Sequence, residues 1–298
     1  MINYKGEKLI SVEICSIQEF ITVIEKLKRN YSFSDERFSK KNRFTPKFVY
    51  RGHSNHADFK LLPGCLRTVN IGDTSYSQYS ILELNTLETF ISEGCRYNST
   101  PIDDYHAWLE IAQHFGVPTR LLDFTENPLV ALYFACVDSG DIDGSVWIVN
   151  EKNYRMNFYK EPPVTKEKDS KLIISSIIQN EILNFNLKYD SNSDIKYPWI
   201  YKPYYREERM MHQASIFMLW GCKRNCFESF MKSENLMSTD KSVNNEKKGI
   251  LIPILIPHNY KKTILKQLED LGISEKFIYP GLDGIGRYVK RKNSIKKF

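Results

Sequence analysis

Apolar residues recur at helical spacing in several stretches of the chain. The first stretch follows Ser16, which has the form of a capping box with Glu19 and begins a run of apolar positions three and four residues apart. The same spacing predicts helices at 81–91, 108–115, 172–185 and 259–271. Asn127 and Pro128 have the form of an N-cap and a first helical position. The helix that they open is almost wholly apolar, so we expect it to be buried on most faces.

Short apolar runs that are bounded by polar or turn residues predict buried strands. Such runs lie at 48–50, 145–149, 215–219 and 249–253, and the segment 119–125 is short and extended in character. The first strand is predicted to end at Arg51 and Gly52, which delivers the arginine at the strand end. A polar loop is predicted at 238–248, where lysine and asparagine are frequent.

The mixture of helices and non-alternating strands predicts an α+β fold, with mixed or antiparallel central sheets flanked by helices. The chain has 298 residues, of which 42% are hydrophobic, and no long polar linker divides it. We therefore expect one domain over 1–298 that ends in a basic tail at 287–298. The tail carries six positive charges, equal to the whole formal net charge of +6, at Arg287, Lys290, Arg291, Lys292, Lys296 and Lys297. Such a tail can contact phosphate, although a solvated end is the more common reason for it.

The sequence favours a cytoplasmic protein without membrane contact. No apolar run reaches the roughly 18 residues of a membrane-spanning helix, and the first residues lack the apolar stretch of a signal peptide. The six cysteines form no CxxC pair, which favours free thiols in a reducing compartment. Cys222 and Cys226, with His212 nearby, have the look of half a metal site, but no second ligand pair follows at zinc spacing. We therefore expect no metal.

Four blocks of the sequence carry a family resemblance. They are FVYRGHSNHADFKLLPGCLR at 48–67, AWLEIAQHFGVPTRLLDFTENPLVALYFA at 107–135, RMMHQASIFMLWG at 209–221 and GISEKFIYPGLDGIGRYV at 272–289. In this order they resemble the FRG family, a microbial domain named for its Phe/Tyr-Arg-Gly motif. The second block is the most specific, because its length, glycine, proline and charged positions all match together. The family name describes a motif and not a reaction, so function has to be argued from the site.

The order of the motifs is also similar, more distantly, to ADP-ribosyltransferases of the Arg-Ser-Glu class. In those enzymes an early strand ends in Arg-Gly, a later strand carries Ser-Thr-Ser ahead of an apolar helix, and a third strand presents a glutamate. Here Arg51-Gly52, the segment 123–125 and the segment 213–215 follow the same sequence of roles. The similarity implies an ADP-ribosyltransferase-like fold and NAD as the ligand. It also implies a bacterial toxin or phage-defence effector.

Within this resemblance each matching residue has an expected role. The planar guanidinium of Arg51 would bind the phosphates of a dinucleotide, and Gly52 would let the backbone approach the nicotinamide amide. Thr125 would support the arginine or the ribose, and a carboxylate such as that of Asp123 would stabilise an oxocarbenium-like state. The implied catalytic set is Arg51, Asp123 and Gln213, and the implied cofactor-binding set is Arg51, Gly52, His53, His114, Arg120 and Thr125.

Several alternatives stay open at this stage. If Gln213 takes the first position of the Gln/Glu-x-Glu motif, Ser215 stands where the catalytic glutamate is expected. Asp123, Glu207 or Glu208 could then supply the carboxylate; otherwise NAD could be bound without being cleaved. Arg51 could be a structural partner of Asp123, Arg120 and Asp123 could form an internal ion pair, and His114 could cap its helix.

Three classes of function therefore compete. The first is an ADP-ribosyltransferase or NAD glycohydrolase with a protein or nucleic-acid acceptor. The second is a non-catalytic module that senses a nucleotide or nucleic acid. The third is a nuclease, which the sequence supports least because it shows no paired-carboxylate metal motif.

Overall fold

The computed structural model describes residues 12–31, 47–71, 74–77, 80–138, 140–158, 197–220, 225–237 and 249–295. It confirms the predicted α+β class. The central feature is a seven-stranded mixed sheet, in the order β1-β9-β6-β2-β5-β8-β7. Its strands are β1 (Val12–Glu13), β9 (Leu251–Ile256), β6 (Gly144–Asn150), β2 (Phe48–His53), β5 (Leu121–Thr125), β8 (Ser215–Leu219) and β7 (Trp199–Tyr201). Only β1 and β9 run parallel to each other; the other neighbours in this sheet are antiparallel.

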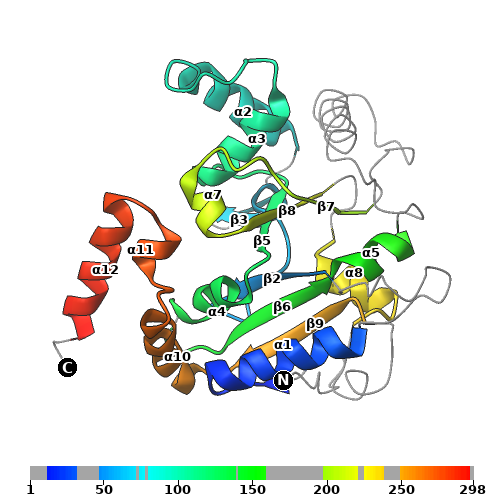
Figure 1. Ribbon diagram of the computed structural model, residues 1–298. Helices are drawn as coiled ribbons and strands as arrows, with labels where there is room; N and C mark the ends of the chain where they lie inside the picture. The colour runs from blue at the N-terminus through cyan, green and yellow to red at the C-terminus, as the bar shows by residue number, and fades with distance from the viewer. Residues whose placement is uncertain are drawn as a thin grey trace, which may run out of the picture.

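Helices cover both faces of the sheet (Figure 1). One face packs against α1 (Ile17–Tyr31), α4 (Pro128–Cys136) and α10 (His258–Asp270), and the other against α5 (Glu151–Phe158) and α8 (Phe227–Ser233). A third apolar cluster joins α2 (Ser80–Gly94) and α3 (Tyr105–His114) to β5, β7 and β8. A short 3-10 turn (Gly64–Leu66) leads to a separate hairpin of β3 (Thr68–Ile71) and β4 (Thr74–Ser77).

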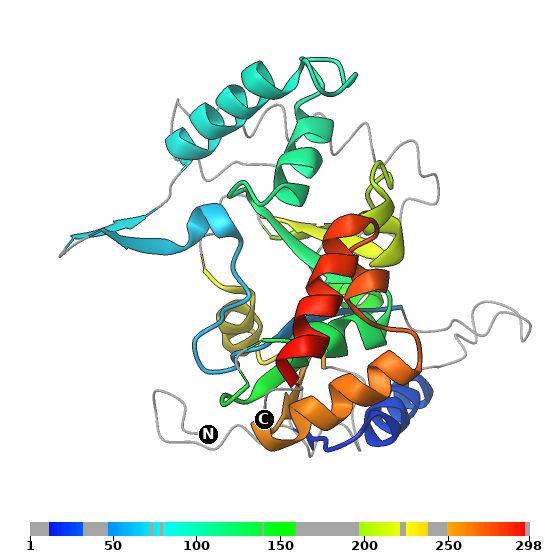
Figure 2. The same ribbon diagram turned by 90° about the vertical axis from the view of Figure 1, so that its left-hand side faces the viewer.

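The C-terminal helices lie beside the half of the sheet that β5, β8 and β7 form (Figure 1). They are α11 (Glu275–Ile278) and α12 (Leu282–Ile295), and α11 contacts α7 (Glu208–His212). Figure 2 shows α11 and α12 in front of the strands, between α10 and α7. The basic segment expected as a tail is therefore helical as far as Ile295, and Arg291 is hydrogen-bonded to Glu269 and Glu275. Among the described helices, none is both long and apolar enough to cross a membrane.

The apolar helix α4 packs unusually close to β2 and β6. Its N-cap is as predicted, since Asn127 accepts a hydrogen bond from the backbone N–H of Leu129 at 3.0 Å. A Cβ atom at Gly52 would lie 2.0 Å from the carbonyl oxygen of Ala131, and one at Gly144 would lie 2.2 Å from that of Ala135. Glycine at 52 is therefore required by the packing of α4, and the approach of its backbone to a ligand stays a prediction.

One expectation about a strand limit changes, and two other predicted segments lie outside the described residues. The predicted end of the first strand at Arg51-Gly52 was wrong, because β2 continues to His53 and pairs with β6 along its whole length. With β5, by contrast, β2 pairs only at Tyr50 and Thr125. The predicted helix at 172–185 and the predicted loop at 238–248 lie outside the described residues.

Candidate functional site

A cleft opens where the ladder between β2 and β5 stops. Its volume is about 210 Å³, and β2, the end of α3, β5, α4, α7 and the start of β8 line it. The polar side chains in its wall are Arg51, Gln113, His114, Asp123, Thr125, Arg209, Gln213 and Ser215. Apolar walls come mainly from Tyr50, Val130, Phe134, Met210 and Phe217. Segments far apart in the sequence therefore meet at one concave place, as the sequence predicted for Arg51, Asp123, Thr125 and Gln213.

The guanidinium of Arg51 spans the gap between β2 and β5. Its Nη1 donates to the backbone carbonyl of Asp123 and lies 3.8 Å from the carboxylate of that residue. Its Nε donates to Nε2 of His53 at 3.0 Å. Burial lowers the pKa of Arg51 to about 10, the charge of Asp123 opposes this shift and that of Arg67 adds to it. Arg51 is therefore still a cation at neutral pH, and 18% of its side chain is exposed at the cleft.

A chain of hydrogen bonds fixes the carboxylate of Asp123. Nε2 of Gln113 donates to Oδ2 of Asp123 at 2.6 Å, and the hydroxyl of Thr119 donates to Oε1 of Gln113 at 2.6 Å. Because an ionised carboxylate only accepts hydrogen bonds, the Nε2 end of the Gln113 amide faces Asp123, and Oε1 is left to accept from Thr119. Asp123 is the one acidic residue among the described residues that line the cleft, and 54% of its side chain is exposed. A negative charge is thus available to a ligand in the cleft.

Thr125 and Gln213 are tied to each other and to the C-terminal block. The hydroxyl of Thr125 donates to the backbone carbonyl of Gln213, and Nε2 of Gln213 donates to the carbonyl of Ile278 at 3.1 Å. Nδ1 of His212 lies 3.0 Å from the carbonyl of Phe277. These contacts join the wall formed by α7 and β8 to α11. The sequence block at 272–289 therefore packs against the block at 209–221 and supports it.

The remaining predicted site residues do not all reach the cleft. His114 lines it, and its pKa is lowered by burial and by the charge of Arg209. His53 is buried behind Arg51 and is absent from the cleft wall. Arg120 is also absent from the wall, because it is buried in a pair with Glu83, with Nη2 to Oε2 at 2.9 Å. The expected Arg120–Asp123 ion pair was therefore wrong.

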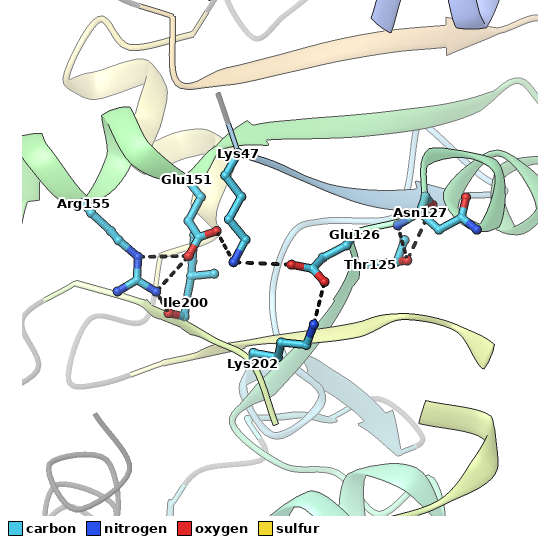
Figure 3. Close-up of polar contacts among 8 residues, drawn as sticks. All are labelled: Lys47, Thr125, Glu126, Asn127, Glu151, Arg155, Ile200 and Lys202. Carbon is cyan, nitrogen blue, oxygen red and sulfur yellow. Dashed lines mark hydrogen bonds and ion pairs between the residues drawn. The ribbon is translucent and has the colours of Figure 1, made fainter. Parts of the chain in front are cut away.

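Next to Thr125 the chain turns away from the cleft into a network of charges. Figure 3 shows the carboxylate of Glu126 between Lys47 and Lys202, and that of Glu151 between Lys47 and Arg155. The hydroxyl of Thr125, drawn in the same view, accepts from the backbone N–H of Asn127. Burial tends to raise the pKa of Glu126, but the hydrogen bond from Lys202 and the charge of Lys47 outweigh it, so the pKa is lowered. The network connects the ends of neighbouring strands and leaves Asp123 as the acid at the cleft.

Sequence reasoning missed two polar residues of the cleft. Gln113 looked like an ordinary helix residue because its role depends on Thr119 and Asp123, which lie beyond the turn at Gly116. Arg209 lies at the start of the RMMHQAS block that carries the resemblance, so its position was a usable signal. Its guanidinium stacks on the ring of Tyr279, 4.7 Å from the centroid. Across the described ranges, no three His, Cys, Asp or Glu side chains gather as metal ligands would.

Comparison with known protein families gives a match to part of the chain. The FRG domain matches residues 46–143, which include Arg51, Gln113, Asp123 and Thr125. Arg209 and Gln213 come from the chain beyond the matched segment. Searches of curated proteins and of solved structures return no significant match.

Proposed function

Because residues 46–143 form an FRG domain whose motif arginine lines a cleft, we propose that this cleft binds NAD. The observation that carries the proposal is the convergence of Arg51, Asp123, Thr125 and Gln213 on one concave surface. These residues come from β2, β5 and the turn before β8, so their meeting is a property of the fold and not of one local segment.

The charges and walls of the cleft suit the parts of a dinucleotide. Arg51 and Arg209 are the cations that would hold the diphosphate, since a guanidinium offers a planar set of donors to phosphate oxygens. The apolar wall of Phe134, Met210 and Phe217 would hold the nicotinamide ring.

The size of the cleft limits how much of NAD it encloses. Pockets that enclose whole ligands span roughly 300–1,000 Å³. The volume of about 210 Å³ is smaller. The cleft would therefore take one half of NAD, and the other half would extend past Arg51 or Arg209.

If NAD is cleaved, the carboxylate of Asp123 is the group that would stabilise the reaction. The bond between the anomeric carbon and the nicotinamide nitrogen breaks with its electron pair leaving on nicotinamide, and positive charge develops on the ribose. Water or an acceptor nucleophile then bonds to that carbon and loses a proton. Such an ADP-ribosyltransferase or NAD glycohydrolase would serve as a toxin or a defence effector in a bacterial cytoplasm.

One observation favours a second candidate, a sensor that binds the nucleotide without cleaving it. Ser215 lies in the cleft wall at the strand start where the resemblance leads one to expect a glutamate. Asp123 is already engaged by Gln113 and by Arg51. A carboxylate held in this way still binds cations, but it is less free to approach a ribose.

Calorimetry with NAD tests the binding proposal. We expect Arg51→Ala to weaken NAD binding by at least about tenfold, because charge-assisted hydrogen bonds to phosphate are lost. Arg51→Lys should restore only part of the affinity, since lysine keeps the charge but not the planar donor geometry. The matched control is Arg96→Ala, which removes an exposed arginine outside the cleft. Equal affinity of the wild type and Arg51→Ala, or no binding at all, would remove the proposal.

Release of nicotinamide separates the enzyme from the sensor. Chromatography of NAD incubated with the wild type should show free nicotinamide if the domain is an enzyme, and Asp123→Asn should lose that activity while keeping NAD binding. A wild type that binds NAD and releases no nicotinamide supports the sensor. Asp103→Asn, at an exposed aspartate outside the cleft, is the control.

A further inference from the structure

A second polar cluster lies behind Arg51, on the face of β2 and β6 opposite α4. Four side-chain atoms there are buried and have no hydrogen-bond partner within the described part of the chain. They are Nδ1 of His53, Nδ1 of His56, Oγ of Ser145 and Nε1 of Trp147. The side chains of three of these residues are more than nine-tenths buried: His53 is 3% exposed, Ser145 0% and Trp147 7%. Buried polar atoms are nearly always satisfied, so a group of four in one place calls for a partner.

The register of the sheet places His53, Ser145 and Trp147 next to one another. His53 of β2 lies directly opposite Ser145 of β6, and Arg51 lies opposite Trp147. Residues two apart on a strand share a face, so the side chains of Arg51 and His53 on β2 and of Ser145 and Trp147 on β6 point to the same side of the sheet. The ring of His56 stacks on that of Trp147, with centroids 5.8 Å apart. The cluster is therefore a local feature of β2, β6 and the turn after β2.

The unpartnered atoms of the cluster are mainly hydrogen-bond donors. Nε of Arg51 is only a donor, so Nε2 of His53 has to accept the bond that joins them. Burial and the charge of Arg51 lower the pKa of His53 to about 2, so its ring is neutral and its one proton is on Nδ1. Nε1 of Trp147 is also only a donor, and the hydroxyl of Ser145 is able to donate. At least two donors, and three with Ser145, need an acceptor.

The local field favours an acceptor that carries negative charge. After burial, the causes that lower the pKa of His53 are the positive charges of Arg51, Arg67 and Lys60 and the neighbouring ring of His56. The ring of His56 also feels Asp143, whose charge raises its pKa, but burial and Lys60 lower it overall. Cations therefore dominate around His53, and an anion with several oxygens would satisfy both the field and the donors.

We propose that His53, Ser145, Trp147 and His56 form an oxyanion site for a phosphate group. The site is separate from the cleft proposed for NAD, because none of these four residues lines the cleft. Arg51 is the wall between the two, with Nη1 turned to Asp123 and Nε to His53. The turn after β2 covers the site: the ring of Phe59 packs edge-on against His53 and is 47% exposed, so movement of this turn would admit the anion.

Nuclear magnetic resonance of the indole N–H groups tests the site with inorganic phosphate as the probe. The Trp147 signal, identified by its loss in Trp147→Phe, should move in a saturable way as phosphate is added to the whole chain. The signals of Trp108 and Trp220 are internal controls that should stay in place, because their indole N–H groups already donate to the carbonyls of Pro101 and Asn225.

Matched serine variants show whether the response belongs to this site. Ser145→Ala should weaken the phosphate response of Trp147 by roughly tenfold, the effect of losing one hydrogen bond to a charged group. Ser215→Ala, which removes the same hydroxyl from the cleft, should leave the response unchanged. Circular dichroism confirms that both variants fold.

A parallel titration with ADP-ribose separates the two sources of phosphate. If the natural occupant is a nucleotide phosphate, ADP-ribose moves the Trp147 signal at lower concentration than inorganic phosphate does and competes with it. If the occupant is free phosphate, ADP-ribose leaves Trp147 in place. Either result supports the site.

A Trp147 signal that never saturates, or an equal response in Ser145→Ala, overturns the proposed site and indicates that these atoms are satisfied by a buried water only. NAD binding at the cleft is measured independently, so either proposal can fail alone.

Discussion

Arg51 and Arg120 are both largely buried, but they have different kinds of partner: Arg120 pairs with a buried carboxylate, and Arg51 with a backbone carbonyl. Nε and Nη2 of Arg120 donate to both carboxylate oxygens of Glu83 at 2.9–3.1 Å, and the side chain of Glu83 is 4% exposed. Nη1 of Arg51 donates to a backbone carbonyl and lies 3.8 Å from a carboxylate that is 54% exposed. The charge of Arg120 is thus matched by Glu83 inside the protein. Arg51 keeps donor capacity and positive charge at a cleft, which is what an anionic ligand requires.

The largest expected effect is on stability and comes from breaking the buried pair. Arg120→Ala would leave the carboxylate of Glu83 buried without its counter-charge, so we expect the free energy of unfolding to fall by about 3–5 kcal/mol. Arg51→Ala should cost less, about 1–2 kcal/mol, because Asp123 stays solvated and only hydrogen bonds are lost. Urea unfolding of the two variants measures the difference.

A double variant checks the reason for the loss at Arg120. Replacing both partners, as in Arg120→Met with Glu83→Leu, removes the unpaired charge and should recover much of the stability. If Arg51→Ala proves the more destabilising of the two single variants, the division of the two arginines into a ligand-facing and a structural one does not hold.

The residue after Arg51 gives a second contrast, since neighbours on one strand serve opposite faces. Gly52→Ala would place a Cβ 2.0 Å from the carbonyl oxygen of Ala131, and this backbone cannot move without shifting α4. We expect the free energy of unfolding to fall by about 3 kcal/mol, the upper end of what overpacking costs. Thermal unfolding followed by circular dichroism is the measurement.

The control for Gly52 is a glycine with free space around it. A Cβ at Gly286 would meet nothing within 4 Å, and the residue lies inside α12. Gly286→Ala should therefore be neutral or stabilising by about 0.5–1 kcal/mol. An unchanged melting temperature for Gly52→Ala would show that α4 does not pack on β2 as tightly as described.

Periodicity and end signals were enough to predict most of the regular elements from the sequence. The helices α1, α3 and α10 and the strands β6 and β8 follow from local patterns, because each buries one face or a short apolar run. The cap of α4 is equally local, since Asn127 bonds within its own turn. The extension of β2 to His53 was missed because Arg51 and His53 are polar, and only the pairing with β6 keeps them in the sheet.

The polar partners of the site were less predictable, because they join residues far apart in the chain. Glu83 and Arg120 are 37 residues apart, and nothing local distinguishes Glu83 from an exposed helix residue. Asp123 was considered as the ion-pair partner of Arg120 because the two residues are close in sequence. The side chains of a strand alternate between faces, however, so proximity along the chain does not imply contact. The convergence of Arg51 with Gln213 was inferred from the order of motifs in the more distant similarity to ADP-ribosyltransferases, which relates segments that lie far apart in the chain.

The smallest expected effect concerns Glu126, the acid beside the cleft that serves structure. Its pKa is lowered in the folded chain, because the bond from Lys202 and the charge of Lys47 outweigh burial. A lowered carboxyl pKa contributes stability above the pKa of the unfolded chain, near 4.5. That contribution is lost as the pH falls through the folded value. Glu126→Gln should therefore lower the melting temperature at pH 6 and converge with the wild type as the pH is taken well below 4.5.

Glu88→Gln is the matched control, because Glu88 is exposed on α2 and its substitution removes the same charge from the chain. Its melting temperature should follow the wild type across the whole pH range. Glu126→Gln should leave NAD affinity unchanged at pH 6, because its carboxylate is turned toward Lys47 and Lys202 and does not line the cleft. A loss of affinity equal to that of Arg51→Ala would place the charge network inside the binding site and erase the distinction between Glu126 and Asp123.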